Sequence, residues 1–159
     1  MTFATADLVD AHPDRLQSCA VQFRSYGGRR VFAGPIRTVR TFEDNALVKE
    51  LLSTPGEGAV LVVDGGGSLA RALVGDILAG LGLANGWNGI VLHGAVRDTV
   101  ALATLDIGVK ALGSNPMKSG KARTGEVDVP VTFGSATFTP GAWLYADEDG
   151  ILVSSEPLL

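Results

Sequence analysis

The hydrophobic pattern is densest between residues 60 and 98, where two apolar runs flank a long apolar segment. Residues 60–63 form an unbroken apolar run, which is typical of a strand buried on both faces, and residues 90–93 predict a second such strand. The segment 68–84 contains almost only apolar or small residues and predicts a buried helix with Ser68 as its N-cap. A helix over about 98–104 and a strand over 108–112 follow, and this alternating order indicates parallel crossovers.

The N-terminal third predicts two helices and one good strand. Residues 3–11 predict a short helix with Thr5 as its N-cap. Residues 31–41 alternate as a strand does, and Pro35 suggests an edge position or a bulge. A helix is expected over roughly 44–53, because its leucine and valine positions fall on one face.

The last third changes from alternating strands and helices to short strands only. Residues 115–125 are polar and contain glycine, which predicts a loop. After it, short runs joined by Gly, Pro and Asp turns predict a β-meander over residues 127–131, 136–139, 143–146 and 151–153. A β/α half followed by a β-meander predicts one α/β domain that spans residues 1–159.

Charge and composition narrow the functional classes. The net charge is −4 and the isoelectric point about 5.1, which argues against direct nucleic-acid binding. A local basic patch stays an alternative, formed by Arg24, Arg29, Arg30, Arg37 and Arg40. The single cysteine, Cys19, excludes a disulfide within the chain. No secretory leader and no apolar run of membrane-spanning length is evident, so we expect a cytoplasmic protein.

A glycine turn at residues 64–70 approximates a dinucleotide-binding fingerprint but does not complete it. The pattern G-x-G-x-x-A follows a predicted strand and precedes a predicted helix. The fingerprint also requires an acidic residue at the end of the next strand, to bind the ribose. That strand ends at His93 and Gly94, so we do not expect a nicotinamide cofactor.

Three charged residues in apolar surroundings are the best candidates for chemistry: Asp76, Arg97 and Asp98. Gly75 is costly inside a helix, so Gly75-Asp76 could end one helix and begin another. The free N–H groups of Ile77 and Leu78 would then form a site for a carboxylate.

The pair at the end of the second buried strand supplies complementary chemistry. Arg97 could bind a keto-acid carboxylate with two parallel hydrogen bonds, and Asp98 could hold a divalent cation. Purely structural roles fit the spacing equally well: Asp98 could be a helix N-cap, and Arg97 could be part of a surface ion pair.

Four segments give the chain a close resemblance to a known family along nearly its whole length. They are Phe42–Asn45, Val62–Ser68, His93–Asp98 and Leu144–Ile151. With them the chain resembles the regulators of ribonuclease activity A and the related 4-hydroxy-4-methyl-2-oxoglutarate aldolases. The resemblance implies a swivelling β/β/α fold and a homotrimeric ring with active sites between subunits.

The aldolases of that family carry an Asp, twenty residues, and then Arg-Asp, which Asp76, Arg97 and Asp98 match. The resemblance implies that Gly75 to Leu78 and Arg97 bind a 2-keto acid and that Asp98 holds Mg²⁺ or Mn²⁺. The implied activity is retro-aldol cleavage to pyruvate, with Asp76 and Arg97 as catalytic residues and oxaloacetate decarboxylation as a side activity. The alternative is a non-catalytic protein that binds and inhibits a ribonuclease of the ribonuclease E type.

Overall fold

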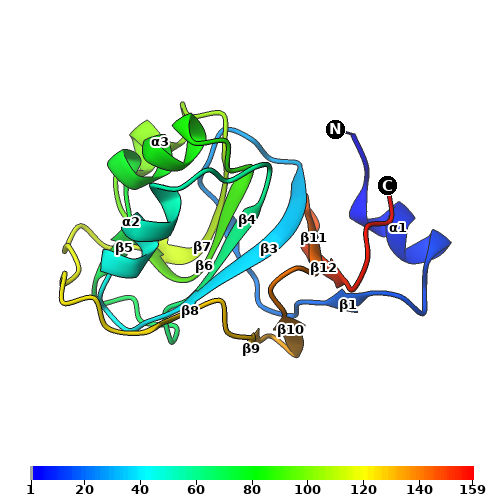
Figure 1. Ribbon diagram of the computed structural model, residues 1–159. Coiled ribbons are helices and arrows are strands. Elements are labelled where there is room, and N and C mark those ends of the chain that lie inside the picture. The colour runs from blue at the N-terminus through cyan, green and yellow to red at the C-terminus, as the bar shows by residue number, and fades with distance from the viewer. Residues whose placement is uncertain (1) are drawn as a thin grey trace.

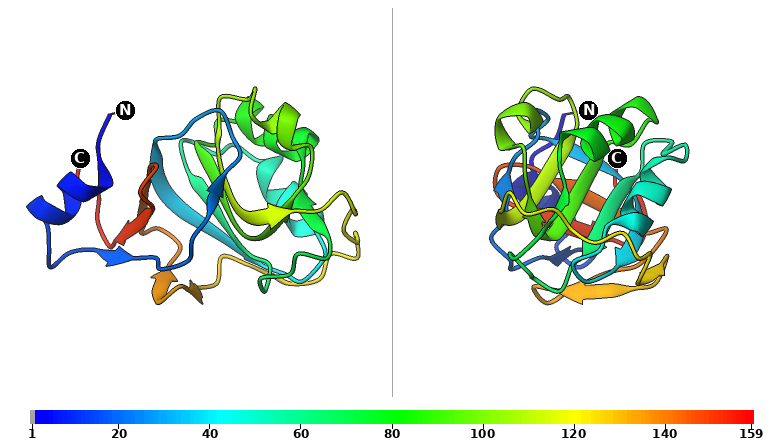
Figure 2. Two further views of the ribbon diagram at one scale, coloured as in Figure 1. Left: turned by 180° about the vertical axis from the view of Figure 1, so that it is seen from behind. Right: turned by 90° about the vertical axis from the view of Figure 1, so that its left-hand side faces the viewer.

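The computed structural model describes residues 2–159 and arranges them in three layers (Figures 1 and 2). The helices are α1 (Thr5–Ala11), α2 (Ala46–Leu52), α3 (Asp76–Ala84) and α4 (Thr99–Leu102). The strands are β1 (Gln17–Ser18), β2 (Arg24–Ser25), β3 (Phe32–Arg40), β4 (Val60–Asp64), β5 (Ala72–Val74), β6 (Gly89–Val96), β7 (Gly108–Ser114), β8 (Glu126–Val127), β9 (Val131–Phe133), β10 (Ala136–Phe138), β11 (Trp143–Ala146) and β12 (Ile151–Ser154).

A parallel sheet of β3, β4, β6 and β7 forms the middle layer. Successive side chains of each strand point to opposite faces of this sheet, so they contribute alternately to two hydrophobic cores. On β4, Leu61 and Val63 face the helices, whereas Val60 and Val62 face the short strands of the last third. The predicted alternation of helices with buried parallel strands is therefore confirmed.

Strand β3 joins the parallel sheet to the β-meander. Residues 32–35 pair with β11 in antiparallel orientation, and residues 36–40 pair with β4 in parallel orientation. Pro35 lies where one partner gives way to the other, so it is at neither an outer edge nor a bulge as expected. A proline is tolerated there because the ladder with β4 begins only at Ile36.

The β-meander covers the face of the parallel sheet that the helices leave open. Strands β11 and β12 form a hairpin, and β9 and β10 form a second one. Side chains from both hairpins pack against Val62 and Val91 in one apolar cluster. This β/β/α layering confirms the predicted fold class. The expected strand over 127–131 is divided, since β8 pairs with β3 and β9 with β10.

The expected helix over 68–84 is wrong in its first half. After the glycine turn the chain forms β5, which lies parallel to β6, and only then α3. An entirely apolar segment has no periodicity that separates a buried strand from a buried helix. The possibility that Gly75-Asp76 begins a new helix is confirmed, because α3 begins at Asp76 with Gly75 as its N-cap.

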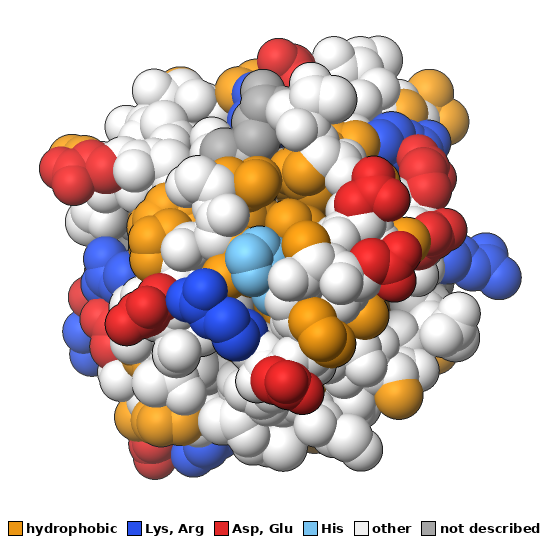
Figure 3. Space-filling model, turned by 90° about the vertical axis from the view of Figure 1, so that its right-hand side faces the viewer, with side chains coloured by type: hydrophobic (Ala, Val, Ile, Leu, Met, Phe, Trp, Pro, Cys, Tyr) orange, Lys and Arg blue, Asp and Glu red, His pale blue; other side chains and the backbone are white. Residues whose placement is uncertain are grey.

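Helix α1 packs at the opposite end of the molecule from α2 and α3, beside both chain ends (Figure 1). Figure 3 views this end, where apolar and charged side chains are interspersed. The N-cap of α1 is Ala4, not Thr5 as expected. Thr5 is the first helical residue, and its backbone N–H and hydroxyl both donate to the buried Asp147 carboxylate at 2.7 Å.

Three of the five arginines in the possible basic patch are already ion-paired. Arg29, Arg37 and Arg40 contact Asp106, Asp128 and Glu126, respectively. Because their charges are largely offset, these positions do not form the continuous basic face that nucleic acid requires. Over residues 2–159, no helix is long and apolar enough to cross a membrane.

Candidate active site

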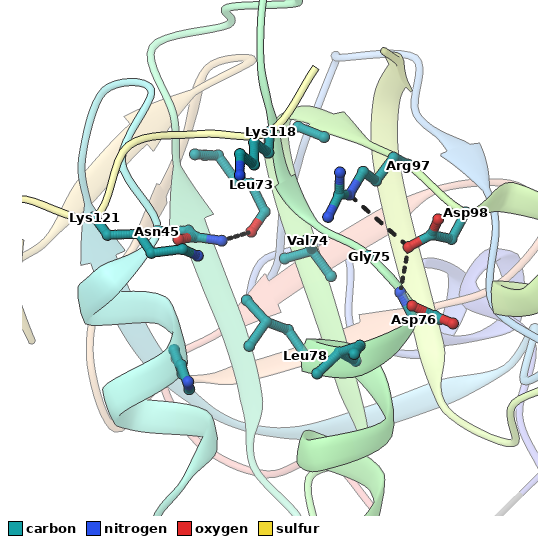
Figure 4. Close-up of a pocket in the computed structure, with 13 residues that line it drawn as sticks. Asn45, Leu73, Val74, Gly75, Asp76, Leu78, Arg97, Asp98, Lys118 and Lys121 are labelled. Atoms are coloured by element: carbon teal, nitrogen blue, oxygen red, sulfur yellow. Dashed lines mark hydrogen bonds and ion pairs between the residues drawn. The ribbon is translucent and has the colours of Figure 1, made fainter. Parts of the chain in front are cut away.

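A pocket of about 190 Å³ opens where β5 and β6 end (Figure 4). Parallel strands direct their carboxyl ends to the same edge, where ligands collect in α/β proteins. The pocket is lined by every residue singled out from the sequence, namely Gly75, Asp76, Ile77, Leu78, Arg97 and Asp98. Twenty intervening residues return the chain to this edge, because α3 and β6 lie between Asp76 and Arg97.

The start of α3 presents backbone donors to this pocket. Gly75 is extended, and its carbonyl accepts the first helical hydrogen bond, from the N–H of Ala79 at 3.1 Å. Asp76 N–H donates to the Asp98 carboxylate at 3.1 Å. Within the described residues, the N–H groups of Ile77 and Leu78 have no hydrogen-bond acceptor. They carry the partial positive charge of a helix N-terminus, which suits a carboxylate.

Asp98 occupies the N-cap position of α4 but does not cap that helix with its side chain. Its backbone is left-handed (φ 58°, ψ 43°), a conformation that Asp adopts more readily than most residues. The carboxylate instead turns to the start of α3, where Oδ2 accepts the Asp76 N–H. The simple N-cap interpretation is therefore wrong in detail, because the side chain caps α3 across the pocket.

Gly75 is required by this arrangement. A Cβ at this position would overlap Asp98 Oδ2 and would lie 3.3 Å from Arg97 Cγ. Its backbone angles are open to other residues, so close approach and not conformation excludes a side chain here. The glycine thus lets the two charged side chains lie directly against the α3 N-terminus.

Arg97 is held by its backbone and leaves its guanidinium available. Its N–H donates to Val74 O at 3.0 Å, which continues the pairing of β5 with β6. Nη1 lies 3.5 Å from Pro116 O, and Nε lies 4.0 Å from Asp98 Oδ2, at the limit of an ion pair. With 43% of the side chain exposed, a guanidinium in such weak contacts can bind a ligand carboxylate.

The acidic groups of the pocket fit a hard divalent cation. Among residues 2–159, no three or more His, Cys, Asp or Glu residues form a metal-binding group. Mg²⁺ nevertheless often binds one or two carboxylates and takes its remaining ligands from water and substrate. Asp98 provides one carboxylate whose Oδ1 has no hydrogen bond within the described part of the chain, and Asp76 provides a second close by.

Sequence reasoning missed the opposite wall of the pocket. Asn45, the N-cap of α2, and Lys49 in its last turn line this wall, together with Lys118 and Lys121 from the loop before β8. Three of the four lysines in the chain line this one pocket. Their positions in the sequence do not indicate this clustering, because it arises only from the tertiary fold.

The glycine turn after β4 does not form a nucleotide-binding loop. Gly66 and Gly67 are left-handed, and the chain then enters β5, so no helix N-terminus faces the glycines. A dinucleotide pyrophosphate needs that N-terminus. Gly67 instead lies against His93, where a Cβ would be 3.4 Å from Cε1.

The chain is similar to known proteins along nearly its whole length. A curated relative from Aromatoleum aromaticum, named "Putative 4-hydroxy-4-methyl-2-oxoglutarate aldolase", is 55% identical over the full length of both chains. The structure of an S-adenosylmethionine: 2-dimethylmenaquinone methyltransferase from Geobacillus kaustophilus matches with a TM-score of 0.97 and 48% identity, over 98% of this chain and 97% of that chain. The RNA-processing inhibitor RraA from Thermus thermophilis matches with a TM-score of 0.96 and 49% identity, over 100% and 96%. A family model described as RraA-like, Aldolase/RraA, matches residues 5–153, and the chain therefore belongs to this family.

Proposed function

We propose that the protein is a divalent-metal-dependent lyase that cleaves 4-hydroxy-4-methyl-2-oxoglutarate to two molecules of pyruvate. The observation that carries the proposal is the convergence of Asp76, Arg97 and Asp98 at the open N-terminus of α3. The name of the full-length relative at 55% identity supports the same substrate.

The keto-acid end of the substrate binds between α3 and Arg97. Its C1 carboxylate accepts hydrogen bonds from the N–H groups of Ile77 and Leu78, where the helix dipole favours negative charge. The Arg97 guanidinium lies beside this position and offsets the negative charge that develops as the C3–C4 bond breaks. Bidentate contact also fixes the orientation of the keto acid.

Asp76 accepts the proton of the 4-hydroxyl group, through one water molecule. As that proton leaves, the oxygen electron pair forms the carbonyl of one pyruvate and the C3–C4 bond breaks. The other fragment becomes pyruvate when a proton is returned to C3. Asp76 suits this role because it lines the pocket from the first turn of α3, and its carboxylate has no hydrogen bond among the described residues.

Asp98 would hold the Mg²⁺ or Mn²⁺ ion. A bound divalent cation supplies Lewis-acid polarisation of the 2-keto group. The hydrogen bond from Asp76 N–H fixes the Asp98 side chain and leaves Oδ1 for the cation or for its bound water. The chain thus positions its metal ligand through the same contact that caps α3.

A pyruvate-release assay tests the proposal. Purified protein should release pyruvate from 4-hydroxy-4-methyl-2-oxoglutarate with Mg²⁺ or Mn²⁺ and should lose this activity in EDTA. Oxaloacetate should also be decarboxylated, since its C3–C4 bond occupies the same position. Asp98→Ala should abolish metal-dependent turnover, and full activity in this variant would exclude the mechanism.

A second candidate function is binding and inhibition of a ribonuclease of the ribonuclease E type. It is favoured by the 49% identity to the RNA-processing inhibitor from Thermus thermophilis over nearly the whole of both chains. An acidic protein would suit a basic partner segment. RNA-decay and pull-down assays with purified ribonuclease E test it, and no effect at micromolar protein would contradict it.

We also propose that the chain works as a homotrimer. Ile77 and Val100 are 78% and 85% exposed, and both lie in helices that begin beside the pocket. Large apolar side chains at such exposure are typical of surfaces that a partner covers. A second subunit here would complete the rim of the pocket, in keeping with the family resemblance.

A further inference from the structure

Strand β5 leads the chain directly into the pocket, but its own ladder is short. No residue separates its end at Val74 from Gly75, the N-cap of α3, so a shift of the strand is passed to the start of the helix. The strand pairs with β6, and the register shifts between Ala72 and Val74. On its other edge, Ala72 N–H donates to Met117 O at 2.7 Å. A three-residue strand with an irregular ladder needs further contacts to fix its position.

Two side chains from the segment between β3 and α2 supply such contacts. Asn45 Nδ2 donates to Leu73 O at 3.1 Å, in the middle of β5 (Figure 4). Glu43 acts where the chain approaches the strand, because its Oε2 accepts the Ser68 hydroxyl at 2.7 Å. Ser68 Oγ in turn accepts the N–H of Ala70 at 3.2 Å. The Glu43 carboxylate therefore orients a hydroxyl group that holds the backbone just before β5.

The surroundings of Glu43 indicate that it acts on the pocket only indirectly. Its side chain is 29% exposed and does not line the pocket. Its second oxygen, Oε1, lies 3.8 Å from Arg71 Nε, beyond hydrogen-bond distance, so the Ser68 contact is the stronger of the two. The Glu43 backbone is left-handed (φ 54°). A non-glycine residue keeps that conformation where the structure around it holds it, and such residues are concentrated at functional sites.

We infer that Glu43 is a positioning residue for the keto-acid site: through Ser68 it fixes β5 and so directs the N–H groups of α3 at the substrate carboxylate. The inference rests on the proposed function, because it assumes that a 2-keto acid binds at the start of α3. A binding group that is held in place before its ligand arrives has a lower entropic cost of recognition. In metal sites, loss of a residue that orients a ligand from behind costs about 10- to 100-fold in affinity or activity.

Calorimetry with pyruvate in the presence of Mg²⁺ tests the inference. Glu43→Ala removes the acceptor of the Ser68 hydroxyl and should weaken pyruvate binding about tenfold. Glu43→Gln keeps an amide oxygen that can accept this hydroxyl, so its affinity should stay within about threefold of wild type. A purely structural role would lower the number of binding sites and leave the dissociation constant of the folded molecules unchanged.

Two results of this titration would count against different claims. If wild type and Glu43→Ala bind pyruvate with the same dissociation constant, the positioning role is wrong. If wild-type protein does not bind pyruvate at all, the proposed function is contradicted, and the positioning role with it.

Glu57→Ala is the matched control. Glu57 is also a left-handed glutamate (φ 53°), it is exposed, and no side-chain hydrogen bond or ion pair joins it to another part of residues 2–159. It precedes β4, at the amino end of the parallel strands, whereas the pocket lies at their carboxyl end. The same substitution on the same backbone conformation should therefore leave pyruvate binding as in wild type. A tenfold loss here as well would assign the effect to the backbone and overturn the inference.

A double-mutant cycle tests whether the hydrogen bond between Glu43 and Ser68 is responsible. Ser68→Ala should also weaken pyruvate binding about tenfold, and Ser68→Ala with Glu43→Ala should bind like Ser68→Ala alone, because both changes break the same contact. Thermal unfolding identifies a temperature at which all variants are folded. Independent losses that multiply to about a hundredfold in the double variant would show that the two residues act separately, which contradicts the inference.

Discussion

At the scale of single residues, Asp76 and Asp98 are close together but are bound differently, and this predicts separate roles. Asp98 Oδ2 accepts a backbone N–H and is fixed, whereas no hydrogen bond holds the Asp76 carboxylate within the described residues. A fixed carboxylate suits a metal ligand, and a free one suits a group that exchanges protons.

Asp76→Asn should therefore separate the two reactions of the proposed enzyme. Retro-aldol cleavage requires removal of the 4-hydroxyl proton, and loss of a general base costs about 10² to 10⁴ in rate. Oxaloacetate has no 4-hydroxyl group, so its decarboxylation should stay within about threefold of wild type. Parallel pyruvate-release assays measure both, and an equal loss in both reactions would assign Asp76 to substrate or metal binding instead.

Gly75→Ala should damage the site but not the fold. The added methyl group would overlap the Asp98 carboxylate, and displacement of a reacting group by about 1 Å can cost 10²-fold in rate. Gly80→Ala is the matched control in α3, because its Cβ would meet nothing within 4 Å. That control should keep full activity and gain up to about 1 kcal/mol in unfolding free energy. Similar kcat/KM values in both variants would contradict the close packing at Gly75.

At the scale of elements, the sequence predicted a segment correctly where its hydrophobic pattern fits only one type of secondary structure. Residues 46–52 form α2 as expected, because leucines at helical spacing fit only an amphipathic helix. Residues 68–84 were mispredicted at β5, where an all-apolar segment fits either structure. The convergence of Asp76 with Arg97 was expected from the family resemblance and not from spacing alone. The three lysines of the opposite wall were not expected, because loop 117–123 reaches the pocket through contacts with distant residues.

The contact between α1 and the β11–β12 turn predicts an acid-sensitive element. Burial raises the pKa of the Asp147 carboxyl, but hydrogen bonds from Thr5 and Asp149 outweigh burial and hold the pKa below its usual value. A lowered pKa in the folded state stabilises the fold above the unfolded-state pKa. That stabilisation is lost as the pH falls from about 3.8 through the folded-state pKa.

Asp147→Asn should remove that acid dependence. The variant loses charge-assisted hydrogen bonds to Thr5 and should unfold about 1–3 kcal/mol more easily at pH 7. The difference from wild type should shrink as the pH is lowered below about 3.8, because the wild-type carboxyl then also becomes neutral. Urea unfolding at several pH values measures this, with the exposed neighbour in Asp149→Asn as the control. A constant difference at all pH values would assign the effect to packing.

At the scale of the whole molecule, two exposed apolar side chains at opposite ends predict different behaviour on substitution. Val100 on α4 is 85% exposed next to the pocket, and Val9 on α1 is 40% exposed at the opposite end (Figure 1). If the proposed trimer forms around the pocket, a charge at Val100 would be buried against a partner without a counterion, which costs several kcal/mol. Val100→Asp should therefore reduce the assembly from three chains to one at micromolar concentration, as measured by sedimentation velocity.

Val9→Asp is the control, because it places the same charge on a helix far from the pocket, and this variant should sediment like wild type. A trimer that persists in Val100→Asp, or a wild-type protein that sediments as a single chain, would contradict an interface at this rim and leave the pocket to function within one subunit.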